Sequence, residues 1–126
     1  MSRFVYGIVI RSGSDDHVSK LAEHASVPVV NALTPLYHPC QALADLLTLK
    51  ERFGGLDGLK VAYVGDGNNV ARSLAIAGSL TGVEVVVAAP DGYQLESDAP
   101  ARLTDDPVEA VKGADAIYGD VWVSMG

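Results

Sequence analysis

Cysteine is nearly absent from this sequence, and long apolar runs are missing. Cys40 is the only thiol in 126 residues, so no disulfide can form within the chain and a reducing compartment is the simpler expectation. The stretch from Val83 to Pro90 is too short to cross a bilayer, and no signal-peptide core follows Met1. These absences predict a cytoplasmic protein with no membrane partner.

Positive charge is also scarce. Nine Lys and Arg residues stand against sixteen Asp and Glu, which gives a net charge of −7. Binding to a phosphate backbone relies on clustered Lys and Arg, and here they are scattered, so we expect no nucleic-acid partner. The composition, 48% hydrophobic and 20% charged, is typical of one compact folded domain. A chain of this size needs no metal or disulfide to fold.

Apolar segments of two kinds alternate along the chain. Five short β-rich runs are mostly continuously apolar, which is typical of strands covered on both faces: Phe4–Ile10, Val27–Ala32, Lys60–Val64, Glu84–Ala89 and Ala116–Val121. Between them, apolar residues recur at helical spacing: Val18, Leu21, Ala22 and Ala25, then Leu43, Leu46, Leu47 and Phe53, then Val70, Leu74, Ala77 and Gly78. Ser14 and Asp106-Pro107 suit helix starts.

This β-α alternation predicts an α/β fold with a parallel, doubly wound sheet. We favour a single domain over residues 1–126, in which five strands form one sheet in a three-layer, flavodoxin-like or Rossmann-like arrangement. The alternative is two half-domains that pair with another copy of the chain, which would give a homo-oligomer. In either arrangement functional side chains should gather at the carboxyl ends of the strands.

The first segment that could bind a ligand or take part in chemistry is His38-Pro39-Cys40-Gln41, immediately before an amphipathic helix. Pro39 suits the first helical turn, and the free backbone N–H groups there can face a ligand, with His38 and Gln41 as further donors. Taken alone, a His at a helix start is more often a capping or packing residue. Cys40 is expected to be a small buried hydrophobe, because no general base lies nearby in the sequence.

The second segment, Gly65-Asp66-Gly67-Asn68-Asn69, follows a strand and opens a helix. A dinucleotide-binding loop needs a small residue where this chain has Val70, and the Gly-Lys-Ser/Thr of a nucleotide-binding P-loop is missing. Two interpretations remain: a tight turn with an Asn cap, or an Asn amide that reaches a polar ligand.

The third segment is Asp120-Val121-Trp122-Val123-Ser124-Met125-Gly126, at the carboxyl end of the last strand. Trp and Met usually belong to a core. Asp120 and Ser124, four residues apart, could also bind an ammonium group, because the carboxylate offers charge and the hydroxyl adds direction.

Together and in this order, the three segments resemble the ornithine carbamoyltransferases, over about Phe4 to Gly126. Aspartate carbamoyltransferases share His-Pro-x-Gln but lack the Asp-Gly-Asn-Asn and Ser-Met-Gly signatures. The resemblance implies carbamoyl transfer from carbamoyl phosphate to the δ-amine of ornithine, giving citrulline and phosphate, with no metal or cofactor. It implies that Arg11 and His38 are catalytic and that the substrates contact Arg11, His38, Gln41, Asn68, Asn69, Asp120, Ser124 and Met125.

The resemblance is incomplete in this chain. The family's Ser-Thr-Arg-Thr phosphate loop and its His-Cys-Leu-Pro loop are both missing, and only residues 94–104 replace an extra helix and strand. We therefore expect a fragment, inactive alone, that joins the end of the carbamoyl-phosphate domain (about 1–53) to the start of the ornithine domain (58–126). Two alternatives stay open: a non-catalytic engineered or model fragment, and a small-ligand-binding module of unrelated function.

One geometric expectation follows from the strand order. The first two strands of a doubly wound sheet normally lie side by side, so the loops that follow them flank one crevice. Arg11 ends the first strand, and His38 and Gln41 open the helix after the second. We therefore expect these three side chains to lie together at one edge of the sheet.

Overall fold

The computed structural model describes residues 2–121, which contain six strands and four helices. Along the chain they are β1 (Ile8–Arg11), α1 (Asp15–His24), β2 (Val29–Leu33), α2 (Pro39–Phe53), β3 (Lys60–Val64), α3 (Asn69–Thr81), β4 (Glu84–Ala88), β5 (Arg102–Thr104), α4 (Pro107–Val111) and β6 (Ala116–Gly119). Within this described part, no helix is both long enough and apolar enough to cross a membrane.

Local sequence signals account for most helix boundaries. The Ser14 hydroxyl accepts the N–H of His17 at the start of α1, and Asp106 caps α4 in the same way. Asn68 caps α3, and Pro39 occupies the first turn of α2. At the other ends, α2 and α3 stop at glycines in the left-handed conformation that residues with a Cβ rarely adopt.

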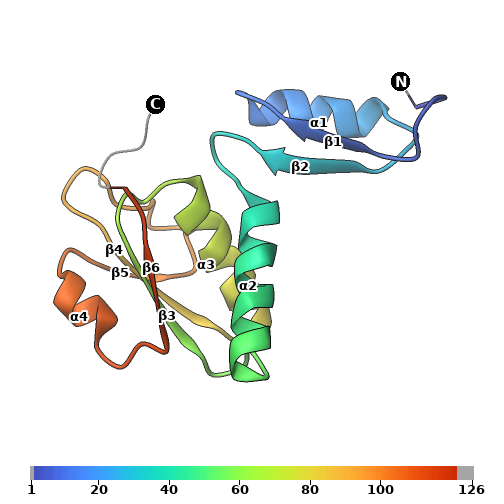
Figure 1. The fold of residues 1–126 in the computed structure, drawn as a ribbon. Coiled ribbons are helices and arrows are strands. Elements are labelled where there is room, and N and C mark those ends of the chain that lie inside the picture. Colours follow the sequence, from blue (N-terminus) through green and yellow to red (C-terminus); the bar gives the residue numbers. More distant parts are fainter. Residues whose placement is uncertain (1, 122–126) are drawn as a thin grey trace.

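The strands form two parallel sheets rather than one (Figure 1). β1 pairs with β2, while the other four strands have the order β5-β4-β3-β6. The expected parallel α/β fold is confirmed, but the single five-stranded sheet is wrong. The sequence also failed to indicate β5, because three residues are too few to show a recognisable strand pattern.

The direction in which α2 packs explains the division into two sheets. Its buried residues Ala42, Leu46 and Leu49 face α3 and the larger sheet, and Leu46 and Leu49 share a core cluster with Val61 and Tyr63 of β3. After β2 the chain therefore does not cross back onto the β1-β2 pair. Periodicity located this helix and its apolar stripe, but could not show which sheet the stripe covers.

The four-stranded sheet has helices on both faces, with α2 and α3 on one side and α4 on the other (Figure 1). Alternate residues of β3 point to opposite sides. Val61 and Tyr63 belong to the larger core cluster. Ala62 belongs to the smaller one, with Val86 of β4 and Ala110 of α4. The expectation of strands covered on both faces is confirmed for β3 and β4, but not for β6, in which Ile117 remains 65% exposed.

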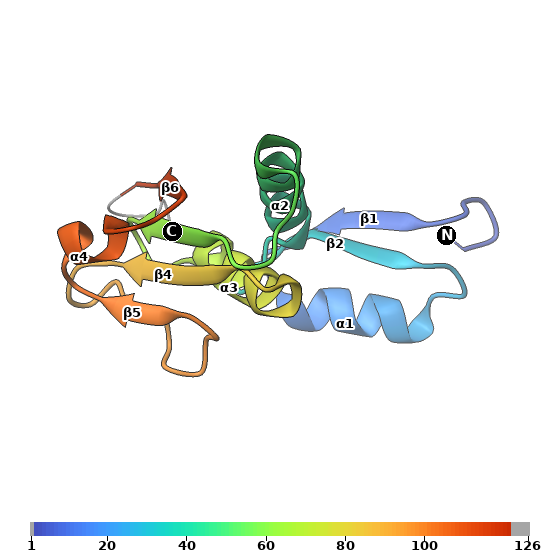
Figure 2. The same ribbon diagram turned by 90° about the horizontal axis from the view of Figure 1, so that it is seen from below.

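The β1-α1-β2 unit is built differently, because α1 covers only one face of its two strands (Figure 2). No side chain in residues 2–33 is buried. Val9 and Val30 are opposite each other in the register and remain 71% and 44% exposed. For these two strands, continuous apolar character did not mean cover on both faces.

Candidate functional site

The carboxyl ends of β3 and β6 meet at one edge of the larger sheet. β3 leads into the loop of residues 65–68, and β6 ends beside Asp120. The Asp120 N–H donates to the carbonyl of Val64 over 3.0 Å, and the Asp66 N–H donates to the carbonyl of Val121 over 2.9 Å. Two segments far apart in sequence are thereby joined, as expected for a parallel sheet.

A polar cluster occupies this edge. The hydroxyl of Tyr63 donates a short hydrogen bond to Asp120 Oδ2, and the Asn68 side-chain amide donates to the same oxygen over 2.9 Å. Asn68 Oδ1 accepts the backbone N–H groups of Val70 and Ala71, which is its capping role, and lies 3.2 Å from the Tyr63 hydroxyl. The interpretation of this segment as a turn with an Asn cap is confirmed, and the Asn68 amide also orients the carboxylate of Asp120. Contact of an Asn amide with a ligand stays a prediction.

The protonation states of this cluster follow from burial and hydrogen bonding. Burial alone would raise the pKa of Asp120, but the hydrogen bonds from Tyr63, Asn68 and the Val121 N–H outweigh it and hold that pKa below its ordinary value. Burial and then the neighbouring Asp120 raise the pKa of Tyr63, so its phenol stays neutral. The cluster is thus an ionised carboxylate held by neutral donors.

Gly67 is required by close packing of the loop rather than by an unusual backbone angle. Its N–H donates to the carbonyl of Tyr93 over 2.7 Å. A Cβ at this position would lie 2.5 Å from the Leu95 nitrogen and 2.6 Å from the Tyr93 oxygen. The backbone of the segment after β4 therefore leaves no room for a side chain at position 67.

The start of α3 also binds the segment that follows β2. Asn69 donates its side-chain amide to the carbonyl of Thr34 over 2.8 Å, and the N–H of His38 donates to Ser73 Oγ over 2.7 Å. Thr34 is fully buried. Asn69 therefore links the start of α3 to the segment that follows β2. A cavity of about 190 Å³ beside it is lined by Pro35, Leu36, Gly67, Asn68, Asn69, Arg72, Gln94, Leu95 and Glu96.

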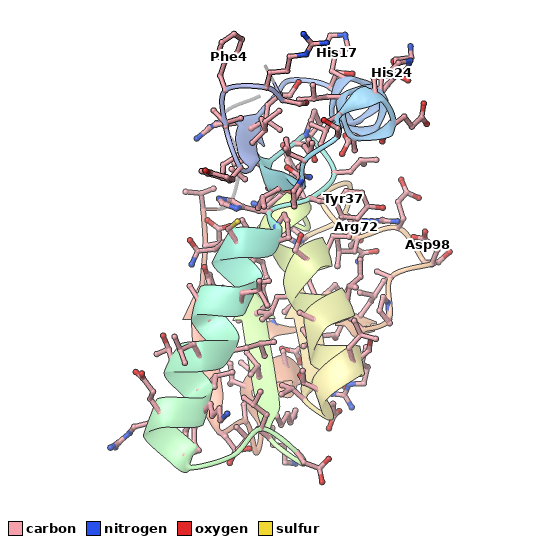
Figure 3. The ribbon with its side chains drawn as sticks, turned by 90° about the vertical axis from the view of Figure 1, so that its right-hand side faces the viewer. Phe4, His17, His24, Tyr37, Arg72 and Asp98 are labelled. Carbon is pink, nitrogen blue, oxygen red and sulfur yellow. The ribbon has the colours of Figure 1, made fainter. Side chains whose placement is uncertain are left out.

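Arg72 strengthens the same junction. Its guanidinium lies 6.0 Å from the centre of the Tyr37 ring and forms a 2.7 Å ion pair with Asp98 (Figure 3). The hydrogen bond to Asp98 raises the pKa of Arg72, which therefore remains charged. Among the described residues, its buried Nε has no hydrogen-bond partner.

His38 is the residue immediately before α2, and Gln41 lies in its first turn, on one helix face with Asp45. Gln41 Nε2 donates to Asp45 Oδ1 over 2.8 Å, and the buried His38 Nδ1 has no hydrogen-bond partner in the described part of the chain. Burial raises the pKa of Asp45, although the bond from Gln41 and the charge of His38 act in the opposite direction. His38 caps no backbone N–H with its side chain.

Arg11 lies at the end of β1, exposed and opposite Leu33 of β2. The two strands are neighbours, as expected, but a common crevice of Arg11 with His38 and Gln41 stays a prediction. Cys40 is exposed rather than buried, and its thiol lies 3.6 Å from the carbonyl oxygen of Asn31 in β2. Ser124 and Met125 lie outside the described residues.

Sequence reasoning missed three residues of this region: Tyr63, Thr34 and Ser73. Tyr63 looked like one apolar member of a strand, although a Tyr one residue from a strand end can place its hydroxyl beyond the sheet. Ser73 looked like a neutral helix residue. Its partner, the His38 N–H, is 35 residues away in sequence, and no local signal indicates such a contact.

Two family models match this chain. Residues 57–126 match the family model described as "Aspartate/ornithine carbamoyltransferase, Asp/Orn binding domain". Residues 1–51 match "Aspartate/ornithine carbamoyltransferase, carbamoyl-P binding domain". The chain belongs to the aspartate/ornithine carbamoyltransferase family. The resemblance that its three segments carried is therefore confirmed.

Relatives and solved structures in this family are close in both sequence and fold. The ornithine carbamoyltransferase of Thermus thermophilus is 57% identical over 130 residues, and that of Acidothermus cellulolyticus is 52% identical over 139. The crystal structure of the Thermus thermophilus enzyme matches 97% of this chain with a TM-score of 0.91 at 56% identity. The Pyrococcus furiosus structure matches 99% with a TM-score of 0.90 at 48% identity.

The chain spans less than half the length of these carbamoyltransferases. It corresponds to 43% of the Thermus thermophilus sequence and 45% of the Acidothermus cellulolyticus sequence, while all of its own residues are covered. For the two structures the share is 44% in each case. The close match over residues from both sheets indicates that the two-sheet arrangement is a family feature and not a peculiarity of this chain.

Proposed function

We propose that this chain supplies part of an ornithine carbamoyltransferase site, where carbamoyl phosphate and ornithine react to give citrulline and phosphate. The observation that carries the proposal is Asp120, an ionised carboxylate that Tyr63 and Asn68 hold at the carboxyl edge of the larger sheet. A carboxylate in that state suits the ammonium group of an amino acid. Family membership makes ornithine the favoured amino acid.

The carbamoyl side of the site is proposed at Arg11, His38 and Gln41. Arg11 is exposed at the end of β1, and a guanidinium can donate to carbonyl and phosphate oxygens while balancing their charge. His38 and Gln41 lie at the start of α2, where backbone N–H groups and the helix dipole favour an anion. These groups would bind and orient carbamoyl phosphate.

The ornithine side is proposed at Asn69 and Asp120, with Asn68 beside them and with Ser124 and Met125, which lie outside the described residues. Asn68 and Asp120 are joined by the 2.9 Å hydrogen bond. Asn69 already donates to Thr34 of the other unit, so a ligand amide or carboxylate would compete with that bond or use its remaining donor.

The reaction itself is an acyl transfer between two bound substrates. The neutral δ-amine attacks the carbamoyl carbon, a C–N bond forms, the C–O bond to phosphate breaks, and the amine loses a proton. Donors aimed at the developing oxyanion would lower the barrier, a role that suits Arg11 and His38. Holding both substrates in line would supply the rest of the rate enhancement.

We also propose that the chain contains the junction between two family domains, about residues 1–53 and 58–126. The two separate sheets and the two matched family models support this division. Tethering at His38-Ser73 and Asn69-Thr34 would then set how the carbamoyl and ornithine sides face each other. Pairing with another copy of the chain stays a prediction.

A domain transplant tests the proposal directly. Residues 1–126 would replace the matching segment of the Thermus thermophilus enzyme, and citrulline formation would be measured. We expect activity in the folded chimera, and a loss of at least about a hundredfold for Asp120→Asn, because removing a single electrostatic group from such a site costs about that much. Asp91→Asn, which removes an exposed carboxylate of equal charge, should change nothing.

The 126-residue chain alone provides the complementary measurement. It contains neither the Ser-Thr-Arg-Thr nor the His-Cys-Leu-Pro motif, so we expect no citrulline above background. A folded chimera without activity would contradict the proposed function. Citrulline formation by the isolated chain at an enzyme-like rate would contradict the need for those two motifs.

A further inference from the structure

Tyr63 is fully buried in β3, yet its hydroxyl reaches the carboxylate of Asp120 at the edge of the sheet. The hydroxyl has one proton and two neighbouring acceptors, Asp120 Oδ2 and Asn68 Oδ1. Asn68 Oδ1 already accepts two backbone N–H groups. Because an ionised oxygen is also the stronger acceptor, the proton goes to Asp120.

The hydrogen bonds that residues 2–121 make to Asp120 leave one acceptor position of its carboxylate unfilled. A carboxylate can accept about four hydrogen bonds, two on each oxygen. In the described part of the chain, Oδ2 receives the Tyr63 hydroxyl and the Asn68 amide, and Oδ1 receives the Val121 N–H over 2.7 Å. The remaining acceptor position is therefore on Oδ1.

The ring of Tyr63 is fixed as firmly as its hydroxyl. β3 is an inner strand that pairs with both β4 and β6, so its backbone cannot shift without breaking two ladders. The ring stacks on Tyr118 of β6, with centres 5.2 Å apart and planes inclined by 23°. A donor held in this way keeps the carboxylate of Asp120 in one orientation.

We propose that Tyr63 is a positioning residue that fixes Asp120 so that its Oδ1 faces the ammonium group of an amino-acid substrate. The inference rests on the proposed function for the identity of that substrate. Tyr63 itself need not touch the ligand, because it acts through the carboxylate. Asn68 shares the task, because its side-chain amide donates to the same oxygen of Asp120.

The arrangement also explains why a neutral buried phenol is useful here. Among the described residues, the titratable groups with a recorded electrostatic interaction with Asp120 are Tyr63 on β3 and Tyr118 on β6, and neither adds positive charge. The carboxylate therefore keeps its full negative charge for an incoming ammonium group. A Lys or Arg in place of Tyr63 would neutralise that charge instead.

The 126-residue chain allows a direct test by ¹³C NMR of the Asp120 carboxyl carbon. The variant Tyr63→Phe removes only the hydroxyl, and we expect the pKa of Asp120 to rise. Tyr118→Phe is the matched control, because it removes the hydroxyl of the other ring in the same stack. None of the hydrogen bonds described for Asp120 involves Tyr118. An unchanged Asp120 pKa in Tyr63→Phe, or an equal rise in Tyr118→Phe, would overturn the proposal.

A measurement on the unaltered chain covers the case in which Tyr63→Phe does not fold. The ζ-carbon signal of Tyr63 should shift with the same midpoint as the protonation of Asp120, because the hydrogen bond weakens when the carboxylate is neutralised. The ζ-carbon of Tyr118 should shift much less. A Tyr63 signal that does not respond as Asp120 titrates would overturn the positioning role.

Addition of L-ornithine to the folded Thermus thermophilus chimera, which restores the two missing motifs, separates this inference from the proposed function. We expect ornithine to shift the Asp120 signal and the dissociation constant to rise about tenfold in Tyr63→Phe, because a carboxylate that is no longer held in one orientation must be ordered when ornithine binds. If ornithine leaves Asp120 unchanged while Tyr63→Phe raises the pKa, the substrate assignment is wrong and the anchoring stands. Equal ornithine affinity in both proteins would overturn the role of Tyr63 in binding.

Discussion

The backbone N–H of His38 donates to the hydroxyl of Ser73 over 2.7 Å, which ties the start of α2 to the middle of α3. Ser73 is almost fully buried, so water cannot easily replace this acceptor. The bond holds in place the segment from which His38 and Gln41 extend. It is therefore a structural contact with direct consequences for the carbamoyl side of the proposed site.

Removal of that hydroxyl should lower stability. Ser73→Ala leaves the His38 N–H without its acceptor, and we expect a loss of about 1–2 kcal/mol in the free energy of unfolding. Ser79→Ala is the control on the same helix, because the exposed Ser79 hydroxyl donates to the carbonyl of Ile76 one turn earlier and, among residues 2–121, has no other recorded hydrogen bond. Urea denaturation of both variants measures the difference, and equal losses would contradict the assigned role of Ser73.

The close packing of Gly67 leads to a second prediction. Gly67→Ala would place a methyl group against the backbone at Tyr93 and Leu95, so one of the two loops must move. We expect a loss of about 3 kcal/mol, the upper end for overpacking a tight site. Gly55→Ala meets nothing within 4 Å and should be close to neutral. Thermal unfolding followed by circular dichroism provides the comparison.

The packing of α2 on the larger sheet can be tested with neighbouring leucines. Leu46 is 5% exposed and belongs to the main core cluster, whereas Leu47 is 56% exposed. We expect Leu46→Ala to cost about 2–5 kcal/mol and Leu47→Ala to cost less than about 1 kcal/mol. A larger effect at Leu47 would mean that the helix presents its other face to the core.

Acid should weaken the fold through Asp120. Its pKa is lower in the folded chain than in the unfolded chain, so its contribution to stability is present above about pH 4, near the unfolded value, and is lost as the pH falls through the folded value. The gap in urea midpoint between the wild type and Asp120→Asn should therefore narrow from pH 6 to pH 3. A constant gap would show that the carboxylate has no special stabilisation.

Asp45 should behave in the opposite sense, which makes it the internal control. Burial raises its pKa, so the folded chain takes up this proton more readily than the unfolded chain does. Its favourable contribution is complete below the unfolded pKa and is lost as the pH rises through the folded pKa. The wild type should accordingly gain stability relative to Asp45→Asn as the pH falls.

Local signals in the sequence were reliable wherever the interacting residues are close along the chain. Asn68 was recognisable as a helix cap because its partners, Val70 and Ala71, follow within three residues. Ser14 and Asp106 were recognisable for the same reason. The short segments around His38, Asn68 and Asp120 also identified the family, since they preserve side-chain types at set positions without reference to distant contacts.

The tertiary structure alone decided which surfaces come together. Leu46 belongs to an apolar stripe in any α/β arrangement, but only packing placed that stripe against α3 and β3 rather than over the β1-β2 pair. The hydroxyl of Tyr63 donates a hydrogen bond to Asp120, which lies 57 residues later in the sequence. Periodicity and capping depend on neighbours three or four positions apart, whereas sheet division and the Tyr63-Asp120 contact depend on which distant segments bury one another's surface.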